Sequence, residues 1–161
     1  MKSHSISRRS FLQSTAVASA PFILPSGIWS ADIKPNDKIV VGFIGMGIQN
    51  RGLQNRFMGD KNVVCVAVSD CDTTRRNAAR DRANKRYQNE DCKTYVDFRE
   101  LIARDDIDAV SIATPDHWHA PATIMACDAG KHVNLEKPAS HNLREGRLMV
   151  EAARRNKRVV Q

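Results

Sequence analysis

The chain has 161 residues, enough for one hydrophobic core once a leader segment is set aside. Its formal net charge is +7, of which residues 1–31 contribute +3 (Lys2, Arg8 and Arg9, with no acid), so the rest of the chain carries +4. A basic run at 75–86 has the spacing of a solvated helix face, without aromatic stacking residues or a recognised nucleic-acid motif beside it. We therefore expect no nucleic-acid partner.

The first 31 residues have the order of an export signal, with a basic start followed by an apolar stretch. That stretch ends at Leu24 and is too short and too rich in Ala and Ser to span about 30 Å of hydrocarbon. Ser7–Gln13 resembles a twin-arginine signal, with Gln where lysine is frequent. The resemblance implies the twin-arginine translocase as a partner and a periplasmic location, and a disordered basic tail is the alternative. The cleavage site stays open because Pro21 follows the small-x-small run Ala18–Ala20.

After a linker at 32–37, short β-rich runs alternate with longer helical segments, a pattern typical of a parallel sheet covered by helices. The expected strands are Ile39–Ile44, Val63–Val68, Asp108–Ala113 and His132–Leu135, with a further strand beginning at Arg158–Gln161. The expected helices are Ile48–Met58, Thr73–Arg86, a short one near 96–102, Ala120–Ala129 and a last one capped by Asn142 with Glu145, while 87–93 is expected to be loop. Residues 38–161 thus predict an α/β Rossmann-type doubly wound parallel sheet, truncated before its last strand.

A pair of glycines lies at the turn between the first strand and the first helix. Gly45 and Gly47 let backbone amides approach a pyrophosphate at a helix N-terminus, where Ile48 opens the helix. Asp70 ends the second strand 25 residues after Gly45, close to the spacing of about 20 for an acid that binds ribose hydroxyls. Asn50 replaces the usual third glycine or alanine, which puts close helix–strand packing in doubt more than phosphate binding. The pattern predicts a dinucleotide site, against the simpler alternative of a tight turn.

The residues after the second strand bear on the choice between NAD and NADP. Asp70 favours NAD, because its carboxylate accepts from both ribose hydroxyls, and Asp72 is a second candidate for that role. Arg75 or Arg76 could instead bind a 2′-phosphate. The sequence therefore favours NAD over NADP and leaves NADP open.

Two further polar segments follow the third and fourth predicted strands. Ala113–His119 reads Ala-Thr-Pro-Asp-His-Trp-His, and Glu136–Pro138 reads Glu-Lys-Pro. Both are expected at the carboxyl edge of the sheet, where open α/β sheets bind ligands. With the glycine turn, these segments resemble the glucose–fructose oxidoreductase/inositol dehydrogenase (Gfo/Idh/MocA) family over residues 38–161. The Glu-Lys-Pro tripeptide, preceded by Ala-Gly-Lys-His-Val, is the most telling part of the resemblance.

The resemblance implies roles for these residues. Lys137 would lie beside the nicotinamide as the catalytic acid/base, with a cis peptide bond between it and Pro138, and Glu136 would contact the nicotinamide ribose. The dinucleotide-contact segment of the family maps onto Thr114, Pro115 and His119. In the simpler reading, Lys137 is a loop lysine and the histidines are surface residues.

The resemblance also implies a C-terminal α+β domain with a substrate pocket, which these 161 residues do not include. The full-length parent is then expected to be an exported NAD(P)-dependent oxidoreductase that acts on a CH–OH group of a sugar, cyclitol or glycoside. On its own, the fragment is expected to be inactive. An NAD-dependent glycoside hydrolase of the same fold and a non-catalytic dinucleotide-binding fragment are the alternatives. A homo-oligomer is compatible with the full-length form.

Metal binding is not expected. The His117-x-His119 pair has no obvious third ligand, and no two of the four cysteines form a CxxC pair. An oxidising destination would permit a disulfide, but the spacing of Cys65, Cys71, Cys92 and Cys127 does not place one.

Overall fold

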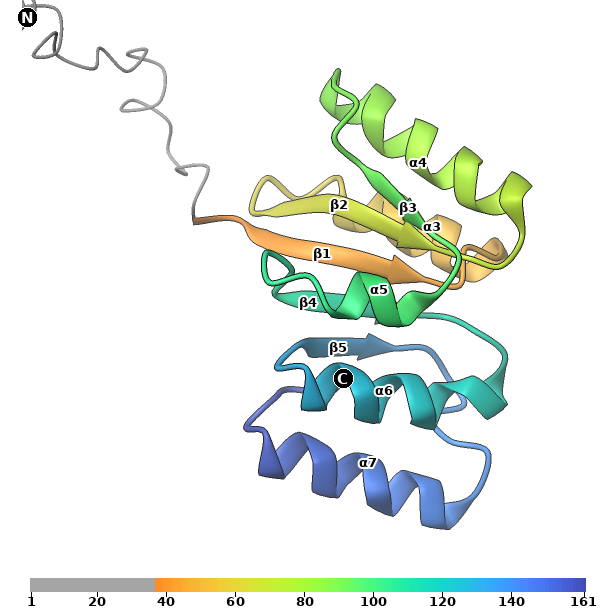
Figure 1. The fold of residues 1–161 in the computed structure, drawn as a ribbon, viewed down its shortest axis with the longest axis vertical. Coiled ribbons are helices and arrows are strands. Elements are labelled where there is room, and N and C mark those ends of the chain that lie inside the picture. Colours follow the sequence, from red (N-terminus) through yellow and green to blue (C-terminus); the bar gives the residue numbers. More distant parts are fainter. Residues whose placement is uncertain (1–36) are drawn as a thin grey trace, which may run out of the picture. The chain divides into compact units, whose positions relative to one another are not determined.

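The computed structural model describes residues 37–161, in which five parallel strands form a sheet in the order β3-β2-β1-β4-β5 (Figure 1). The strands are β1 (Ile39–Ile44), β2 (Val63–Ser69), β3 (Lys93–Tyr95), β4 (Ala109–Ile112) and β5 (His132–Leu135). This order is that of the doubly wound dinucleotide-binding fold, so the predicted fold class is confirmed. The leader predicted at 1–31 and the linker at 32–37 lie outside the described residues, except for residue 37.

Helices cover both faces of the sheet (Figure 1). The core on one face joins the sheet to α3 and α4, and the core on the other joins it to α5, α6 and α7. The helices are α3 (Ile48–Phe57), α4 (Thr73–Tyr87), α5 (Phe98–Ile102), the 3-10 helix η2 (Asp116–Trp118), α6 (His119–Asp128) and α7 (Leu143–Arg155). No helix among residues 37–161 has both the length and the apolar character that a membrane span requires.

The central strands are apolar because both of their faces are covered. In β1, every residue from Val41 to Ile44 is buried, and Phe43 is completely enclosed. Since all strands run parallel, their carboxyl ends meet at one edge of the sheet. Helix α3 and the segments before α4, η2 and α7 begin at that edge, so four chain segments converge there.

Side chains that accept hydrogen bonds from first-turn amides begin several helices. Asp72 caps α4, Asp97 caps α5 and Asn142 caps α7. The predicted cap at Asn142 is confirmed, because its Oδ1 accepts from the Glu145 amide at 2.9 Å. The return contact differs from a standard capping box: the Glu145 carboxylate accepts from the His141 amide at 3.1 Å.

Two predicted boundaries differ from the structure. The sequence predicts loop over 87–93, whereas Tyr87 ends α4 and Lys93 begins β3. Strand β3 is a three-residue edge strand with the sequence Lys-Thr-Tyr, too short and too polar to show a strand pattern. In the strand predicted at Arg158–Gln161, the structure has only an isolated parallel bridge between Val133 and Val160.

Asn50 fixes the start of α3 against two strands. Its side chain is completely buried, and Nδ2 donates to the carbonyls of Ile44 (3.0 Å) and Ser111 (3.2 Å). Its Oδ1 accepts from the Ser111 hydroxyl at 3.0 Å. The expectation from the sequence that Asn50 would weaken the packing of the helix against the strands was therefore wrong. The Asn50 side chain stands where the fingerprint has a third glycine, and it makes three hydrogen bonds to β1 and β4.

We predict that Asn50→Ala lowers the free energy of unfolding by roughly 1–3 kcal/mol, because it removes the acceptor of the buried Ser111 hydroxyl and a donor to the Ser111 carbonyl. Urea denaturation followed by circular dichroism measures the loss. Asn55→Ala is the matched control, since Asn55 is exposed on the same helix, and it should change stability by at most about 0.5 kcal/mol. Equal stability of the two variants would contradict the assigned role.

Candidate nucleotide-binding site

The candidate site lies at the carboxyl ends of β1, β2, β4 and β5. Strand β1 pairs with both β2 and β4, so the chain leaves the sheet in opposite directions on its two sides. This is the topological switch point at which open α/β sheets bind ligands. The structure brings the predicted segments to it: the glycine turn follows β1, Asp70 follows β2, Thr114 follows β4 and Glu136 follows β5.

The turn after β1 requires a glycine at its first position. Gly45 has φ +80°, and a Cβ there would lie 2.9 Å from the Ala113 carbonyl oxygen and 3.0 Å from Cγ2 of Thr114. Any other residue would therefore be strained in its backbone and would collide with the segment after β4. Gly45 lets the turn lie directly against that segment.

The second glycine leaves the start of α3 open. Gly47 is the N-cap of α3 in an extended conformation, and no side chain of the described residues caps the first-turn amides. A Cβ on Gly47 would meet nothing within 4 Å, and the Ile48 side chain that follows is 84% exposed. These amides at the positive end of a ten-residue helix can receive a phosphate group.

Asp70 joins the glycine turn to the end of β2. Its Oδ2 accepts from the Met46 amide at 2.6 Å, and its Oδ1 accepts from the Asp72 amide at 2.8 Å. A carboxylate has about four acceptor positions, so each oxygen keeps capacity for a ligand hydroxyl. The Arg76 guanidinium donates to the Asp70 carbonyl at 2.7 Å and lies beside the same turn.

Asp72, the other acid considered for the ribose, serves as a helix cap. Its Oδ1 accepts from the amides of Thr74 (2.8 Å) and Arg75 (3.1 Å). The hydrogen bond from the Arg75 amide is the main cause of the lowered pKa of Asp72, with the Thr74 amide and the positive charge of Arg75 adding to it. The structure thus gives the two acids different surroundings, and Asp70 is the one that contacts the glycine turn.

The segment after β4 contributes one hydroxyl without a partner. The Oγ1 atom of Thr114 is buried and has no hydrogen-bond partner among residues 37–161. Pro115 follows as the N-cap of η2, and it is exposed. Since Thr114 lies against the Gly45 turn, its unpaired hydroxyl belongs to the candidate site.

His119 links two of the converging loops. Only 2% of it is exposed, its Nδ1 lies 2.6 Å from the Pro138 carbonyl oxygen, and its Nε2 lies 2.9 Å from the Thr114 carbonyl oxygen. Both neighbours are carbonyl acceptors, so each ring nitrogen that carries a hydrogen donates to one of these loops. The structure places His119 behind the site, where it holds the loops after β4 and β5 together.

The Glu-Lys-Pro segment is held at its first residue. The Glu136 amide donates to the Ile112 carbonyl at 2.9 Å, and its carboxylate accepts from the Gln49 amide side chain at 2.6 Å and from the Lys137 amide at 3.2 Å. The cis bond before Pro138 that the resemblance implied is confirmed. Lys137 is exposed, and the structure gives its ammonium group no hydrogen bond or ion pair within residues 37–161.

The remaining histidines at this edge gather around one carboxylate. His141 lies 3.5 Å and His117 lies 3.6 Å from the Asp116 carboxylate. The hydrogen bond from His141 is the main cause of the lowered pKa of Asp116, followed by the His117 amide. No group of three His, Cys, Asp or Glu side chains within residues 37–161 is arranged to hold a metal ion.

Sequence reasoning missed two contributors to the site. The Met46 amide binds Asp70, and Gln49 binds Glu136 across 87 residues of sequence. The position of Met46 between the two glycines was a usable signal, because the fingerprint assigns backbone amides of that turn to ligand binding. Gln49 carried no such signal, since its partner comes from a distant loop.

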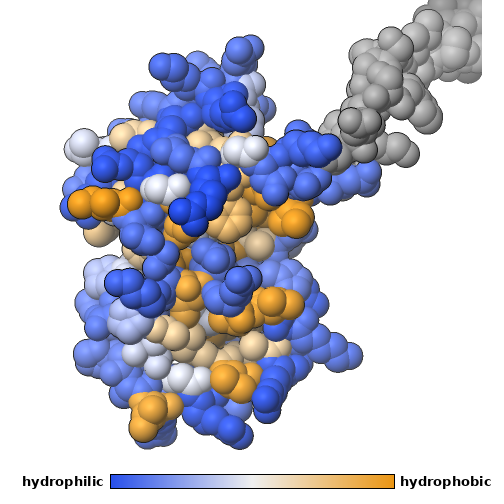
Figure 2. Space-filling model, turned by 180° about the vertical axis from the view of Figure 1, so that it is seen from behind, coloured by the Kyte–Doolittle hydropathy of each residue, from blue (hydrophilic) through white to orange (hydrophobic). Residues whose placement is uncertain are grey.

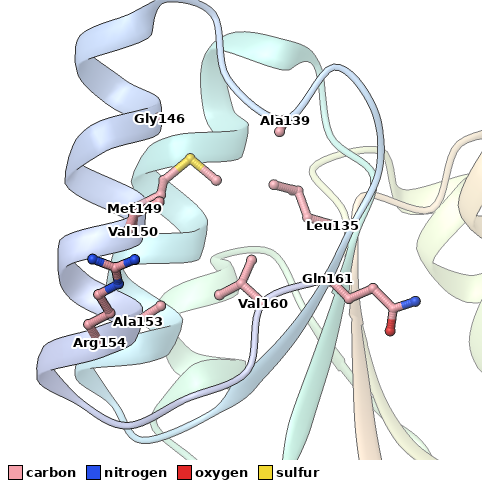
Figure 3. A pocket seen from close by; sticks show the side chains of 9 residues that line it. All are labelled: Leu135, Ala139, Gly146, Met149, Val150, Ala153, Arg154, Val160 and Gln161. Carbon is pink, nitrogen blue, oxygen red and sulfur yellow. The ribbon is translucent and has the colours of Figure 1, made fainter.

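An apolar groove lies apart from the glycine turn, beside β5 and α7. It has a volume of about 370 Å³. Figure 3 shows the side chains that line it: Leu135, Ala139, Gly146, Met149, Val150, Ala153, Arg154, Val160 and Gln161. In Figure 2, apolar residues are also visible in the lower half of the view, the half that contains β5 and α7 in Figure 1. The groove contains none of the predicted nucleotide-contact residues.

Comparison with known proteins agrees with this geometry. A family model described as "Oxidoreductase family, NAD-binding Rossmann fold" (GFO_IDH_MocA) matches residues 39–161. A glycosyl hydrolase family 109 protein of Shewanella baltica is 28% identical over 180 residues, which cover 96% of this chain and 38% of that protein. The chain therefore spans little more than a third of the length of the curated relatives it matches.

Solved structures share the fold. An NAD binding oxidoreductase from Klebsiella pneumoniae is 30% identical with a TM-score of 0.62, over 77% of this chain and 34% of that one. The WlbA dehydrogenase from Bordetella pertussis, in complex with NADH and UDP-GlcNAcA, is 22% identical with a TM-score of 0.68, over 76% of this chain and 36% of that one. By the match of its whole described fold to the family model, the chain belongs to the Gfo/Idh/MocA oxidoreductase family with an NAD-binding Rossmann fold.

Proposed function

We propose that residues 37–161 bind NAD in a full-length, exported oxidoreductase that removes hydride from a CH–OH carbon of a sugar, cyclitol or glycoside. One observation carries the proposal: the uncapped amides of α3, the Asp70 carboxylate and the Glu-Lys-Pro segment converge at one sheet edge. The WlbA dehydrogenase, whose structure holds NADH, shares this fold and supports a nicotinamide dinucleotide as the cofactor.

The residues at this edge fit a dinucleotide. The α3 amides and the open space around Gly47 suit a pyrophosphate, and the close approach at Gly45 leaves the turn without a side chain. The carboxylate of Asp70 can accept from the adenosine ribose, and the orphan hydroxyl of Thr114 gains a partner from a ligand. Glu136, held by Gln49, would accept from the second ribose.

The surroundings of Asp70 favour NAD over NADP. A 2′-phosphate would lie near the carboxylates of Asp70 and Asp72, and like charges at such distances repel. Arg76 already donates to the Asp70 carbonyl and to the Thr73 hydroxyl, and Arg75 lies 3.8 Å from the Asp72 carboxylate. Both guanidinium groups are therefore engaged locally, which supports NAD as the cofactor.

Lys137 is proposed as the acid/base for the substrate hydroxyl. When bound, the nicotinamide supplies the hydride acceptor. The Lys137 ammonium group has no partner among the described residues, and its backbone is held by the Glu136 carboxylate on one side. On the other side, His119 holds the Pro138 carbonyl. The side-chain nitrogen of Lys137 would take the hydroxyl proton as hydride leaves the carbon that bears that hydroxyl.

The names of the curated relatives suggest a different reaction, glycoside hydrolysis. Identity of 28–30% over part of their length does not carry that reaction to this chain. Incubation of the full-length protein with glycosides and NAD separates the two chemistries. Net NADH formation supports the dehydrogenase, and release of aglycone without net NADH would contradict it.

For the cofactor site, we predict that Asp70→Ala weakens NAD binding at least about tenfold, because it removes the ribose acceptors and the bond to the Met46 amide. Isothermal titration calorimetry of the chain with NAD and NADP measures both affinities. Asp105→Ala is the matched control, since Asp105 is exposed in the connection before β4. Unchanged NAD affinity, or tighter binding of NADP than of NAD to the parent, would refute the assignment of Asp70.

For the chemistry, we predict that Lys137→Ala in the full-length protein lowers kcat by roughly 10²–10⁴, the usual contribution of a positioned acid/base. Nucleotide affinity should change little, because the pyrophosphate and adenosine contacts lie at α3 and Asp70. Stopped-flow hydride transfer at saturating NAD separates the two effects, with the exposed Lys85→Ala as control. A rate close to that of the parent would make Lys137 a loop lysine.

Export is proposed from Arg8 and Arg9, which lie outside the described residues. The twin-arginine receptor distinguishes arginine from lysine, so the double variant Arg8→Lys/Arg9→Lys should remain in the cytoplasm although its charge is preserved. Cell fractionation measures the periplasmic yield, and Lys2→Arg serves as the charge-preserving control. Equal yields from the double variant and the parent would indicate a general secretory signal.

A further inference from the structure

Two thiols that are far apart in sequence share one core. Cys65 lies within β2 and Cys92 lies immediately before β3, and their exposed fractions are 2% and 3%. Both belong to the core between the sheet and the α3–α4 pair. The Cys92 thiol lies 3.9 Å from the Lys93 carbonyl oxygen, and its interaction with the Cys65 thiol is the main cause of the shifted pKa of each group. The two side chains therefore pack in the same part of the core.

The strand register brings the two residues close together. Ala67 of β2 pairs with Lys93 of β3, so Cys92, one residue before that pair, lies next to Val66, the residue after Cys65. The pairing of β2 with β1 skips Val66, so side chains do not alternate regularly here, and both cysteines face the same core. Regular parallel strands about 4.8 Å apart, with a rise of about 3.3 Å per residue, would put the two Cα atoms about 6 Å apart. Disulfides bridge Cα atoms separated by about 4.4–6.8 Å, so this register brings the two residues within the range of such a bond.

The surroundings make Cys65 the nucleophile of the pair. The hydrogen bond from Cys92 is the main cause of the lowered pKa of Cys65, and burial opposes it. Gln54 adds to the lowering through its Nε2, 3.6 Å from the Cys65 sulfur, and the charge of Arg82 acts in the same direction. The pKa of Cys92 is raised by its interaction with Cys65 and by burial. The thiolate is the reactive form of cysteine, so Cys65 reacts first.

The location allows a reagent to reach these buried atoms. Strand β3 is the edge of the sheet and has three residues, and residues 88–91 before Cys92 are all exposed. Local opening of a short edge strand costs far less than global unfolding. Cys127 differs, because it lies within α6 in the core on the opposite face of the sheet.

We propose that Cys65 and Cys92 are a redox pair that closes to a disulfide between β2 and the start of β3 when a small-molecule disulfide is supplied. The Cys65 thiolate attacks the reagent, whose S–S bond breaks and releases one thiolate. The Cys92 thiolate then attacks the Cys65 sulfur of the mixed disulfide, forms the new S–S bond and displaces the second reagent thiolate. Two protein thiols are oxidised, one reagent disulfide is reduced, and the protons from Cys65 and Cys92 end on the two released thiols.

The test uses the 161-residue chain with the exposed Cys71 replaced by Ser, which removes the surface thiol. After full reduction and removal of the reductant, the folded protein is incubated with glutathione disulfide. The titratable thiols in denaturant should fall from three to one, with a mass loss of two hydrogen atoms, and peptide mapping should join Cys65 to Cys92. The midpoint of thermal unfolding should rise by roughly 5–10 °C, because the bond closes a long loop of the unfolded chain.

Two further variants locate the bond. Cys92→Ala should abolish both the mass loss and the thermal shift, whereas Cys127→Ala should retain both. Three remaining thiols, or a disulfide that maps to Cys127 or joins two chains, would overturn the proposal. The peptide map of the Cys71→Ser protein alone decides the outcome if a core variant fails to fold.

Discussion

The close approach of the β1–α3 turn to the segment after β4 is the constraint on which the site depends. Gly45 takes a left-handed conformation and leaves no room for a Cβ against the Ala113 carbonyl. Five residues later, Asn50 binds β1 and β4 at once. Because the turn and the helix start are both fixed to β4, the free amides of α3 point out at the switch point of the sheet. A looser contact would leave the same amides without a defined position.

Two side chains then connect the four converging loops into two pairs. Asp70 joins the end of β2 to the glycine turn through the Met46 amide, and His119 joins the loops after β4 and β5 through two carbonyls. Each connection runs from a side chain to a backbone group of another segment, so it fixes the backbone of that segment. The loops that form the site are therefore fixed by Asp70, which lines the site, and by His119, which lies directly behind it.

The sequence predicted the parts of this site that depend on local pattern. Gly45, Gly47 and Asp70 stand at fixed spacing around a strand and a helix, and the fold class followed from alternating strands and helices. The role of Asn50 could not be predicted, because it depends on Ser111, 61 residues away. Strand β3 was missed for another reason: an edge strand of three partly polar residues forms by pairing with β2 and has no hydrophobic period of its own.

The side chains on the adenosine side of the site are fixed by contacts within residues 37–161, whereas the side chain on the reacting side is not. On the adenosine side, Asp70 holds two amides and lies beside Arg76, so its geometry is set before any ligand arrives. On the reacting side, only the backbone of Lys137 is fixed, and its exposed ammonium group has no partner within residues 37–161. A flexible lysine must be oriented to act as an acid/base, because its contribution depends on hydrogen-bond reach to the reacting hydroxyl. Cofactor binding can therefore be separated from chemistry, and the orientation of Lys137 has to come from the bound ligands or from residues other than 37–161.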